Sequence, residues 1–158
     1  MITVNAMKTI VLSIGGQRVL IDEDDAERVA RIKWNVNGRY ARCRSPMTIY
    51  MHRFIMNAVV GQSVDHKNGN PLDNRKENLR FCTMSQNIAN SACRSSSSGF
   101  KGVYFDKRSQ RWQAKIKVNY RSVYLGCYRT REEAAIVYNA GALAHFGAFA
   151  LLNDVDES

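Results

Sequence analysis

The first elements of the chain are predicted by the alternation of apolar and polar residues. In TIVLSIGGQRVLI, residues 9–21, the alternation runs on both sides of Gly15 and Gly16, which predicts a β-hairpin. The acidic segment DEDDAERVARI predicts a short helix, because carboxylates stabilise the N-terminus of a helix. WNVNGRYARCRS then returns to a strand-like pattern, so residues 1–48 are expected to form a β-rich scaffold.

The middle of the chain is predicted to contain a helix, a hairpin and a second helix. A short helix is indicated by apolar residues at helical spacing, Met51, Phe54, Ile55 and Ala58. Gly61 is expected to end it, and His52 beside its apolar face is interpreted as structural. In SVDHKNGNPLDNRKENLRFCTMSQN, two alternating runs flank a long segment of turn formers, and TMSQ has the pattern of a capping box with Thr83 as N-cap. The order is therefore strand, turn, strand, helix.

The last third of the chain has the pattern of a separate module. A serine-rich run, residues 93–98, is typical of a linker, and three short strands and a helix are predicted behind it. RWQAKIKV and RSVYLGCY alternate apolar with polar residues and are joined by Asn119 and Tyr120, which suit a tight turn. By this alternation Cys127 lies on the apolar face. A second capping box, in TREE, opens the final helix.

Composition and charge favour a nucleic-acid partner. The chain has 158 residues, with 23 Lys and Arg against 14 Asp and Glu and a formal net charge of +9, which suits binding to a polyanion. Nine Lys and Arg lie between Phe100 and Arg131, against the single acid Asp106 before the helix. Because a solvated face normally mixes charges, we expect this sheet to contact DNA. Three further residues are either DNA contacts or a solvated strand face: Arg39, Arg42 and Arg44.

The cysteines and the apolar runs suggest an intracellular protein. The four cysteines stand singly, at positions 43, 82, 93 and 127, without the short pair spacings of a zinc or redox site, so we expect reduced thiols. No apolar run approaches the roughly twenty residues that span a bilayer, and the N-terminus lacks the order of a secretion signal. We therefore expect a cytoplasmic protein with no membrane partner and no organic cofactor.

The stretch from Ser63 to Asn87 carries groups suited to phosphodiester hydrolysis. Asp65 and the amide oxygen of Asn87 are hard ligands that suit Mg²⁺, or Mn²⁺ in its place. His66 is able to take a proton from an attacking water, and Asn78 either orients this imidazole or braces the loop. The competing interpretation is that these side chains only cap turns. Turn formation alone is expected of three further asparagines, Asn68, Asn70 and Asn74.

VDHKNGNPLDNRKENLRFCTMSQN, preceded by MHRFIMNA, resembles the HNH endonucleases that occur as free-standing homing enzymes in phages and mobile introns. The resemblance implies a ββα-metal core over residues 49–92. In that core Asp65 and Asn87 bind one divalent metal, His66 is the general base and Asn78 supports the site. The last ligand is an asparagine here, where other branches of the family have a histidine.

GFKGVYFDKRSQRWQAKIKVNYRSVYLGCYRTREEAAIVYNAGALAHFGAFALLN resembles the AP2 DNA-binding domain of plant transcription factors and phage homing endonucleases. The resemblance implies, over residues 99–153, a three-stranded antiparallel sheet packed on one helix. It implies DNA contacts by Lys101, Tyr104, Arg111, Trp112, Lys115, Lys117 and Tyr124. Arg121 is added as a basic residue of the same segment, and Trp112 also fits the core by its alternation.

Together these features predict an α+β protein that acts as a site-specific DNA endonuclease of the homing type, in a bacterial or phage-infected cell. One metal centre cuts one strand at a time, so a monomer nicks duplex DNA and double-strand cleavage requires a homodimer or a second event. One alternative is a regulator that binds a DNA sequence on the same scaffold without cutting. Another is a single-strand or RNA binder that stacks bases on Tyr104, Trp112 and Tyr124.

Overall fold

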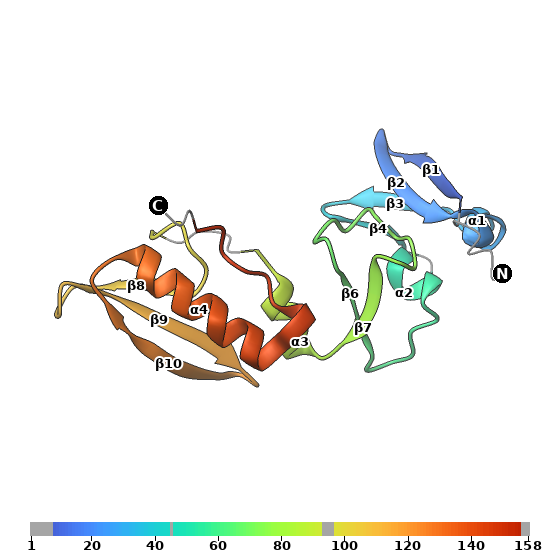
Figure 1. Ribbon diagram of the computed structural model, residues 1–158. Coiled ribbons are helices and arrows are strands. Elements are labelled where there is room, and N and C mark those ends of the chain that lie inside the picture. Colours follow the sequence, from blue (N-terminus) through green and yellow to red (C-terminus); the bar gives the residue numbers. More distant parts are fainter. Residues whose placement is uncertain (1–7, 45, 93–96, 156–158) are drawn as a thin grey trace, which may run out of the picture. The chain divides into compact units, whose positions relative to one another are not determined.

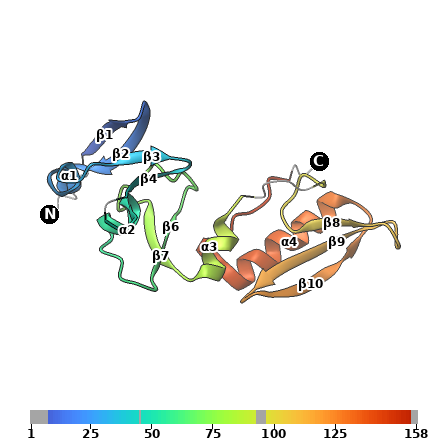
Figure 2. The ribbon, with the colours of Figure 1, turned by 180° about the vertical axis from the view of Figure 1, so that it is seen from behind.

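The chain divides into two compact units, residues 1–82 and residues 83–158. The computed structural model describes residues 8–44, 46–92 and 97–155, and Figures 1 and 2 show its elements from opposite sides. Helices and strands occur in both units, so the predicted mixture of the two is confirmed. The likeness to a ββα-metal core and to an AP2 domain stays a prediction.

Small sheets and short helices make up the first unit. In chain order its elements are β1 (Thr9–Ile14), β2 (Gln17–Asp22), α1 (Glu23–Ala30), β3 (Asn35–Asn37), β4 (Tyr40–Cys43), β5 (Ile49–Tyr50), α2 (Met51–Ile55), β6 (Ser63–His66) and β7 (Leu79–Cys82). β1 pairs with β2, β3–β4–β5 form a sheet in that order, and β6 pairs with β7, all antiparallel. Burial of apolar side chains holds these elements around one core: Val19, Ile21, Val29, Trp34, Ala41, Met51, Ile55, Val64 and Leu79.

The first two predicted elements are confirmed. β1 and β2 form a hairpin whose turn places Gly15 and Gly16 at φ +58° and +79°, a left-handed conformation that glycine adopts without a steric penalty. The helix α1 follows directly, with acidic residues in its first turn, Glu23, Asp24 and Asp25.

The helix α2 ends earlier than predicted. Met51 and Ile55 are buried in the core, as their spacing predicts, but the helix stops at Ile55 and does not reach Gly61. Asn57 has a φ of +51°, and its N–H donates to the carbonyl of Phe54 at 3.2 Å. Asparagine is among the few residues that take this left-handed conformation, so Asn57 ends the helix in place of a glycine.

The long turn between β6 and β7 is attached to β2. The N–H of Leu20 donates to the carbonyl of Leu72 at 2.8 Å, and the N–H of Asn74 donates to the carbonyl of Leu20 at 2.8 Å. Leu20 and Asp73 form a parallel bridge, so residues 72–74 lie beside β2 like a short extra strand. The N-terminal hairpin therefore holds part of the β6–β7 turn in place.

An antiparallel sheet with a helix on one face makes up most of the second unit (Figure 1). Its elements are α3 (Met84–Asn90), β8 (Val103–Asp106), β9 (Arg111–Val118), β10 (Arg121–Tyr128), α4 (Arg131–Phe146) and the 3₁₀ helix η1 (Gly147–Phe149). The strand order is β10–β9–β8, and α4 packs on all three strands. The predicted capping boxes at Thr83 and Thr130 are confirmed, as is the turn at Asn119 and Tyr120, with φ +47° and +66°.

The alternation of side chains in β10 is interrupted in the middle of the strand. The pairing with β9 shifts between Tyr124 and Gly126, which marks a β-bulge. Beyond the bulge Cys127 pairs with Gln113, on the polar face of the sheet. The prediction that Cys127 lies on the apolar face is therefore wrong, because alternation alone does not reveal an extra residue in one strand.

The helix α3 belongs to the second unit. The N–H of Leu151 donates to the carbonyl of Ala89 at 3.2 Å, and the N–H of Asn119 donates to Oγ of Ser85 at 3.1 Å. The boundary between the units therefore falls before α3, whereas the sequence pattern groups this helix with the hairpin β6–β7.

The predicted serine-rich linker is described only in part. Residues 93–96 lie outside the described residues, whereas Ser98 is buried and its Oγ donates to the carbonyl of Val103 at 2.9 Å. Ser98 is thus packed into the second unit. Among the described residues, no helix is both long enough and apolar enough to cross a membrane. The predicted domain limits stay predictions: 1–48, 49–92 and 99–153.

Candidate active site

Strand β6 places Asp65 and His66 next to each other, on opposite sides of the strand. In the pairing with β7, Asp65 lies opposite Arg80 and His66 opposite Leu79. Both side chains are buried, since each residue is only 6% exposed. A buried carboxylate and a buried imidazole both require polar partners, and these two have different ones.

The carboxylate of Asp65 is held by Arg80 from the neighbouring strand. Nε of Arg80 donates to Oδ2 of Asp65 at 2.9 Å, and a second guanidinium nitrogen lies 2.8 Å from the same oxygen. This ion pair compensates the buried charge and fixes the orientation of the carboxylate. Sequence reasoning missed Arg80, because the long turn between β6 and β7 left the register of the hairpin open.

The imidazole of His66 contacts the side chain of Asn74, which is 1% exposed. Nε2 of His66 lies 3.4 Å from Oδ1 of Asn74. Because an amide oxygen accepts but does not donate, this contact requires a proton on Nε2 and leaves the lone pair on Nδ1. Burial lowers the pKa of His66 below 6.5, although Asn74, Asp65 and Asp73 act in the opposite direction. The imidazole is therefore neutral at neutral pH and able to accept a proton.

Rings from β4 and α2 pack against His66, and a ring from β5 packs against the one from α2. The ring centroid of His52 lies 4.9 Å from that of His66, and the centroid of Tyr40 lies 6.2 Å from it. Tyr40 and Tyr50 lie 5.4 and 5.7 Å from His52. Burial, followed by the influence of His66 and Arg53, lowers the pKa of His52 from 6.5 to about 3. Among the described residues, Nδ1 of His52 has no hydrogen-bond partner, which fits a packed, neutral ring.

Asn78 braces the turn between β6 and β7. Its Nδ2 donates to the carbonyl of Asp73 at 2.8 Å, and its Oδ1 accepts from the N–H of Asn68 at 3.0 Å. Its backbone carbonyl accepts from the N–H of Lys67 at 2.8 Å. Of the two roles considered for Asn78, these contacts are those of a brace, whereas Asn74 is the residue beside the imidazole.

The other asparagines of the turn differ in their roles. Oδ1 of Asn68 accepts from the N–H of Asn70 at 2.9 Å, and Oδ1 of Asn70 accepts from the N–H of Leu72 at 3.1 Å. Both therefore form turns, as predicted. The prediction that Asn74 only forms a turn was wrong, because it is bonded to β2 and touches His66. Nothing local in the sequence distinguishes it, since its partner in β2 is far away along the chain.

Buried charges anchor this turn to the N-terminal elements. Both carboxylate oxygens of Asp73 accept from the guanidinium of Arg75 at 2.8 Å, and these bonds lower the pKa of Asp73. Asp22, at the end of β2, accepts from the N–H of Lys76 at 2.8 Å. Asp25 of α1 lies 2.9 Å from Nζ of the same lysine. The turn is therefore tied to both β2 and α1.

Asp65 and Asn87 carry oxygen ligands of the kind that a hard cation binds. In the part of the chain that is described, no three His, Cys, Asp or Glu side chains form a group that could hold a metal ion. A carboxylate and an amide oxygen instead suit Mg²⁺ or Mn²⁺, which take their remaining ligands from water and substrate. Asn87 lies in α3 of the second unit, so its share in a common site with Asp65 stays a prediction.

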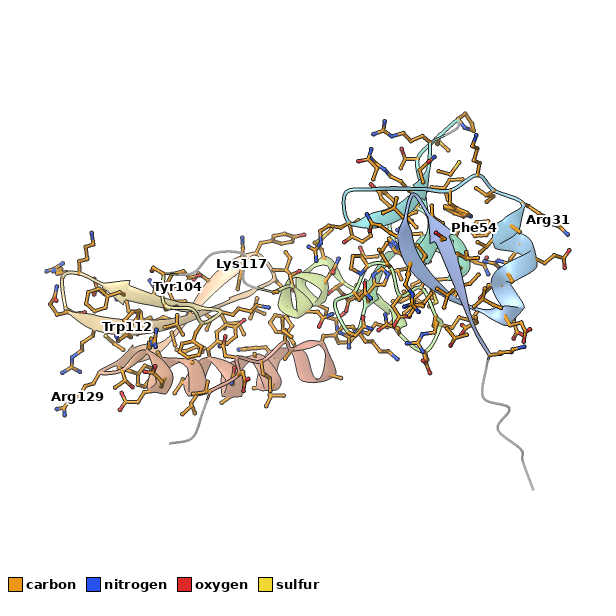
Figure 3. All side chains as sticks on the ribbon, turned by 90° about the horizontal axis from the view of Figure 1, so that it is seen from above. Arg31, Phe54, Tyr104, Trp112, Lys117 and Arg129 are labelled. Carbon is orange, nitrogen blue, oxygen red and sulfur yellow. The ribbon has the colours of Figure 1, made fainter. Side chains whose placement is uncertain are left out.

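The polar face of the sheet in the second unit carries most of the predicted DNA contacts. Strand pairing places five of them on this face: Tyr104, Arg111, Lys115, Lys117 and Tyr124. Tyr104 and Lys117 are labelled on the side of the sheet away from α4 in Figure 3. Tyr104 and Tyr124 are exposed although their rings are large and apolar. Such a surface of rings and cations suits nucleic acid, and the contact itself stays a prediction.

The other three predicted DNA contacts lie elsewhere. Nζ of Lys101 donates to backbone carbonyls at the end of α3, with a distance of 2.7 Å to that of Ser91, so it caps this helix. Trp112 is half-buried on the face toward α4, with its ring centroid 4.9 Å from that of Phe105. Arg121 lies at the exposed start of β10.

Comparisons with known proteins connect this site to a nuclease family. A family described as HNH endonuclease matches residues 50–89, which include Asp65 and His66. An uncharacterized HNH endonuclease of Acanthamoeba polyphaga mimivirus is 34% identical over 112 residues, which are 67% of this chain and 58% of that protein. Protein 3.8 of Escherichia phage T7 is 33% identical over 84 residues, which are 46% of this chain and 69% of that protein. A comparison with solved structures finds no significant match. The chain therefore belongs to the same family as Protein 3.8, and its residues 50–89 form an HNH endonuclease domain.

Proposed function

We propose that this protein is a DNA endonuclease of the homing type that hydrolyses phosphodiester bonds with one divalent metal. The observation that carries the proposal is the pair of neighbours on β6. His66 is a neutral, buried imidazole oriented by Asn74, and Asp65 is a buried carboxylate oriented by Arg80. Both lie within the segment that matches the HNH endonucleases.

His66 acts as the general base in this proposal. The contact with Asn74 holds the proton on Nε2, so Nδ1 is the nitrogen that takes a proton from the attacking water. Because burial lowers the pKa of His66, the ring is already unprotonated at neutral pH. His52 and Tyr40 restrict the rotation of the ring by packing against it.

Asp65 and Asn87 would hold the metal, with Mg²⁺ as the preferred ion and Mn²⁺ as a substitute. When bound, the ion would supply positive charge that stabilises the charge developing on the phosphate and on the leaving oxygen. Arg80 keeps the carboxylate of Asp65 in one orientation. Asn78 supports the site by bracing the turn that carries Asn74.

The second unit supplies DNA binding in this proposal, through an AP2-like sheet. Its contacts are the side chains on the polar face: Tyr104, Arg111, Lys115, Lys117 and Tyr124. Lys101, which caps α3, Trp112, which packs toward α4, and Arg121, at the start of β10, stay predicted contacts beside this surface. The proposed activity of a monomer is nicking of duplex DNA.

The test is nicking of a supercoiled plasmid library that carries many candidate target sites, with Mg²⁺ or with a chelator. The wild type should relax the plasmids only with metal. His66→Ala should lower the rate by roughly 10²–10⁴-fold, the usual contribution of a general base. His145→Ala is the matched control, because His145 is an exposed histidine at the end of α4, and it should cut like the wild type.

Binding measurements on the same DNA separate the nuclease from the non-cutting regulator. The proposed function requires that His66→Ala still binds the DNA that the wild type nicks. If the wild type binds DNA but leaves every plasmid supercoiled in Mg²⁺ and in Mn²⁺, the nuclease proposal fails. The regulator would then be the better reading of the same scaffold.

A further inference from the structure

The small sheet β3–β4–β5 has two chemically different faces. Val36, Ala41 and Cys43 alternate toward the core of the first unit. The opposite face carries only polar and aromatic side chains, paired across the strands: Asn35 with Arg42, Asn37 with Tyr40, and Arg42 with Tyr50. Packing in the core explains the residues of the first face only. It does not explain why arginine and tyrosine occupy the second face.

This polar face reaches the candidate general base. The ring centroid of Tyr40 lies 6.2 Å from that of His66 and 5.4 Å from that of His52, and Tyr50 lies 5.7 Å from His52. Tyr40 is nevertheless 37% exposed, so one part of its ring packs against the site while another part faces solvent. The surface that carries Tyr40 and Arg42 is therefore continuous with the imidazole of His66.

The charge of this region is also one-sided. Residues 28–64 contain no Asp or Glu and seven basic residues: Arg28, Arg31, Lys33, Arg39, Arg42, Arg44 and Arg53. Three of these are engaged within the protein: Arg28, Arg31 and Arg53. Arg39 and Arg42 form no hydrogen bond or ion pair among the described residues, and they flank Tyr40 on β4 and its turn.

We infer that the polar face of β3–β4–β5 is a second DNA-binding surface, which holds the strand to be cut against His66. The inference rests on the proposed function, and the occupant it names is duplex DNA. Arg42 contacts a backbone phosphate, and Tyr40 contacts the nucleotide beside the scissile bond. A face whose strands carry arginine and no Asp or Glu, next to a phosphodiester-cleaving centre, complements the charge of the substrate.

The binding test uses the full-length chain in the His66→Ala background, so that the DNA stays intact. Arg42→Gln and the matched control Arg18→Gln each remove one charge from a strand, and Arg18 is exposed on β2, which belongs to a different sheet. Affinity for a duplex is measured by fluorescence anisotropy over a series of salt concentrations. Arg42→Gln should weaken binding and reduce the salt slope by about 0.9, the value for one lost phosphate contact, and Arg18→Gln should leave the slope unchanged.

The cleavage test measures single-turnover nicking by variants that keep His66. Tyr40→Ala should slow nicking by about tenfold, as expected for one lost contact near the reacting centre. Tyr40→Phe keeps the ring packed against His52 and should slow nicking by a smaller factor. A thermal melt confirms that each variant is folded. If Arg42→Gln melts at a lower temperature than the wild type, Arg39→Gln, at the exposed hairpin turn, replaces it in the binding test.

The two proposals fail in different ways. If Arg42→Gln, or Arg39→Gln in its place, binds with the affinity and salt slope of the control, the second DNA surface is refuted even though the wild type nicks. If the wild type never nicks, the proposed function fails, while the salt slopes still decide whether this face binds DNA.

Discussion

Lowering the pH from 7 to 5 should destabilise the first unit through His52. This ring is 8% exposed and packed among Tyr40, Tyr50 and His66. Burial, followed by the influence of His66 and Arg53, lowers its pKa from 6.5 to about 3. The folded protein therefore keeps the ring neutral at pH 5, whereas the unfolded chain protonates it below about pH 6.5. Because the pKa is depressed on folding, stability is complete above pH 6.5 and is lost as the pH falls.

The size of this effect follows from the two pKa values. One pKa unit corresponds to about 1.36 kcal/mol, so the full difference between 6.5 and about 3 corresponds to roughly 5 kcal/mol once the pH is below both values. At pH 5 only the part between 6.5 and 5 has been lost, which is about 2 kcal/mol. An effect of that size is a large fraction of the stability of a small domain.

Urea unfolding at pH 7 and pH 5 measures this loss. A Trp112→Phe background leaves Trp34 as the reporter, and Trp34 is buried in the core of the first unit with its indole N–H bonded to the carbonyl of Val29. His52→Phe keeps a ring in place but does not titrate. Between pH 7 and pH 5 the variant should lose about 2 kcal/mol less than the wild type.

The comparison between the two proteins isolates His52, because His66 is present in both. Its pKa is also lowered by burial, so both proteins should lose some stability in acid. Equal losses in the wild type and in His52→Phe would refute the account of a buried, neutral His52. A larger loss in the variant would show that the ring is stabilised by protonation, which is the opposite sign.

Three other substitutions test the hydrogen bonds and the packing inside each unit. Asn78→Ala should lower the free energy of unfolding by about 2–3 kcal/mol, because the buried carbonyl of Asp73 loses its side-chain donor; a loss below 1 kcal/mol would argue against the brace. Gly102→Ala should destabilise the second unit by about 2 kcal/mol or more, since a Cβ there would lie 2.1 Å from the ring of Tyr138, and a circular dichroism melt unchanged by it would contradict that packing. Thr130→Ala should cost about 1 kcal/mol through the lost cap of α4, and equal urea midpoints for variant and wild type would contradict the capping box.

Features that depend on neighbouring residues were predictable from the sequence. The hairpin at Gly15 and Gly16 and both capping boxes depend on side chains within a few residues of each other, and all were found where expected. The end of α2 was missed because Asn57 and Gly61 both suit a helix end, and the sequence favours neither strongly. The bulge in β10 was missed because an extra residue leaves no trace in the apolar pattern.

Features that depend on contacts between residues far apart in the sequence could not be predicted from it. The contact of Asn74 with His66 depends on backbone bonds between Leu20 and residues 72–74, which lie some fifty positions apart in the chain. Arg80 reaches Asp65 only because one register of the hairpin β6–β7 is chosen among several. Asp65 and His66 were proposed as site residues from residue type and spacing, and the structure adds that both are buried on adjacent positions of β6, while their catalytic roles stay a prediction.

The N-terminal region is therefore more than a scaffold for the candidate active site. β2 fixes the segment that carries Asn74, β4 supplies Tyr40, whose ring packs against His66, and β5 supplies Tyr50, whose ring packs against His52. Asp22 and Asp25 are buried carboxylates that both contact Lys76 in the β6–β7 turn, so removal of that turn would take a polar partner from each of them. Residues 50–89 alone match the HNH endonuclease family, yet the surroundings of His66, the proposed general base, depend on residues that precede that match. An excised segment of residues 50–89 should thus lose the geometry at His66 even where its own hairpin forms.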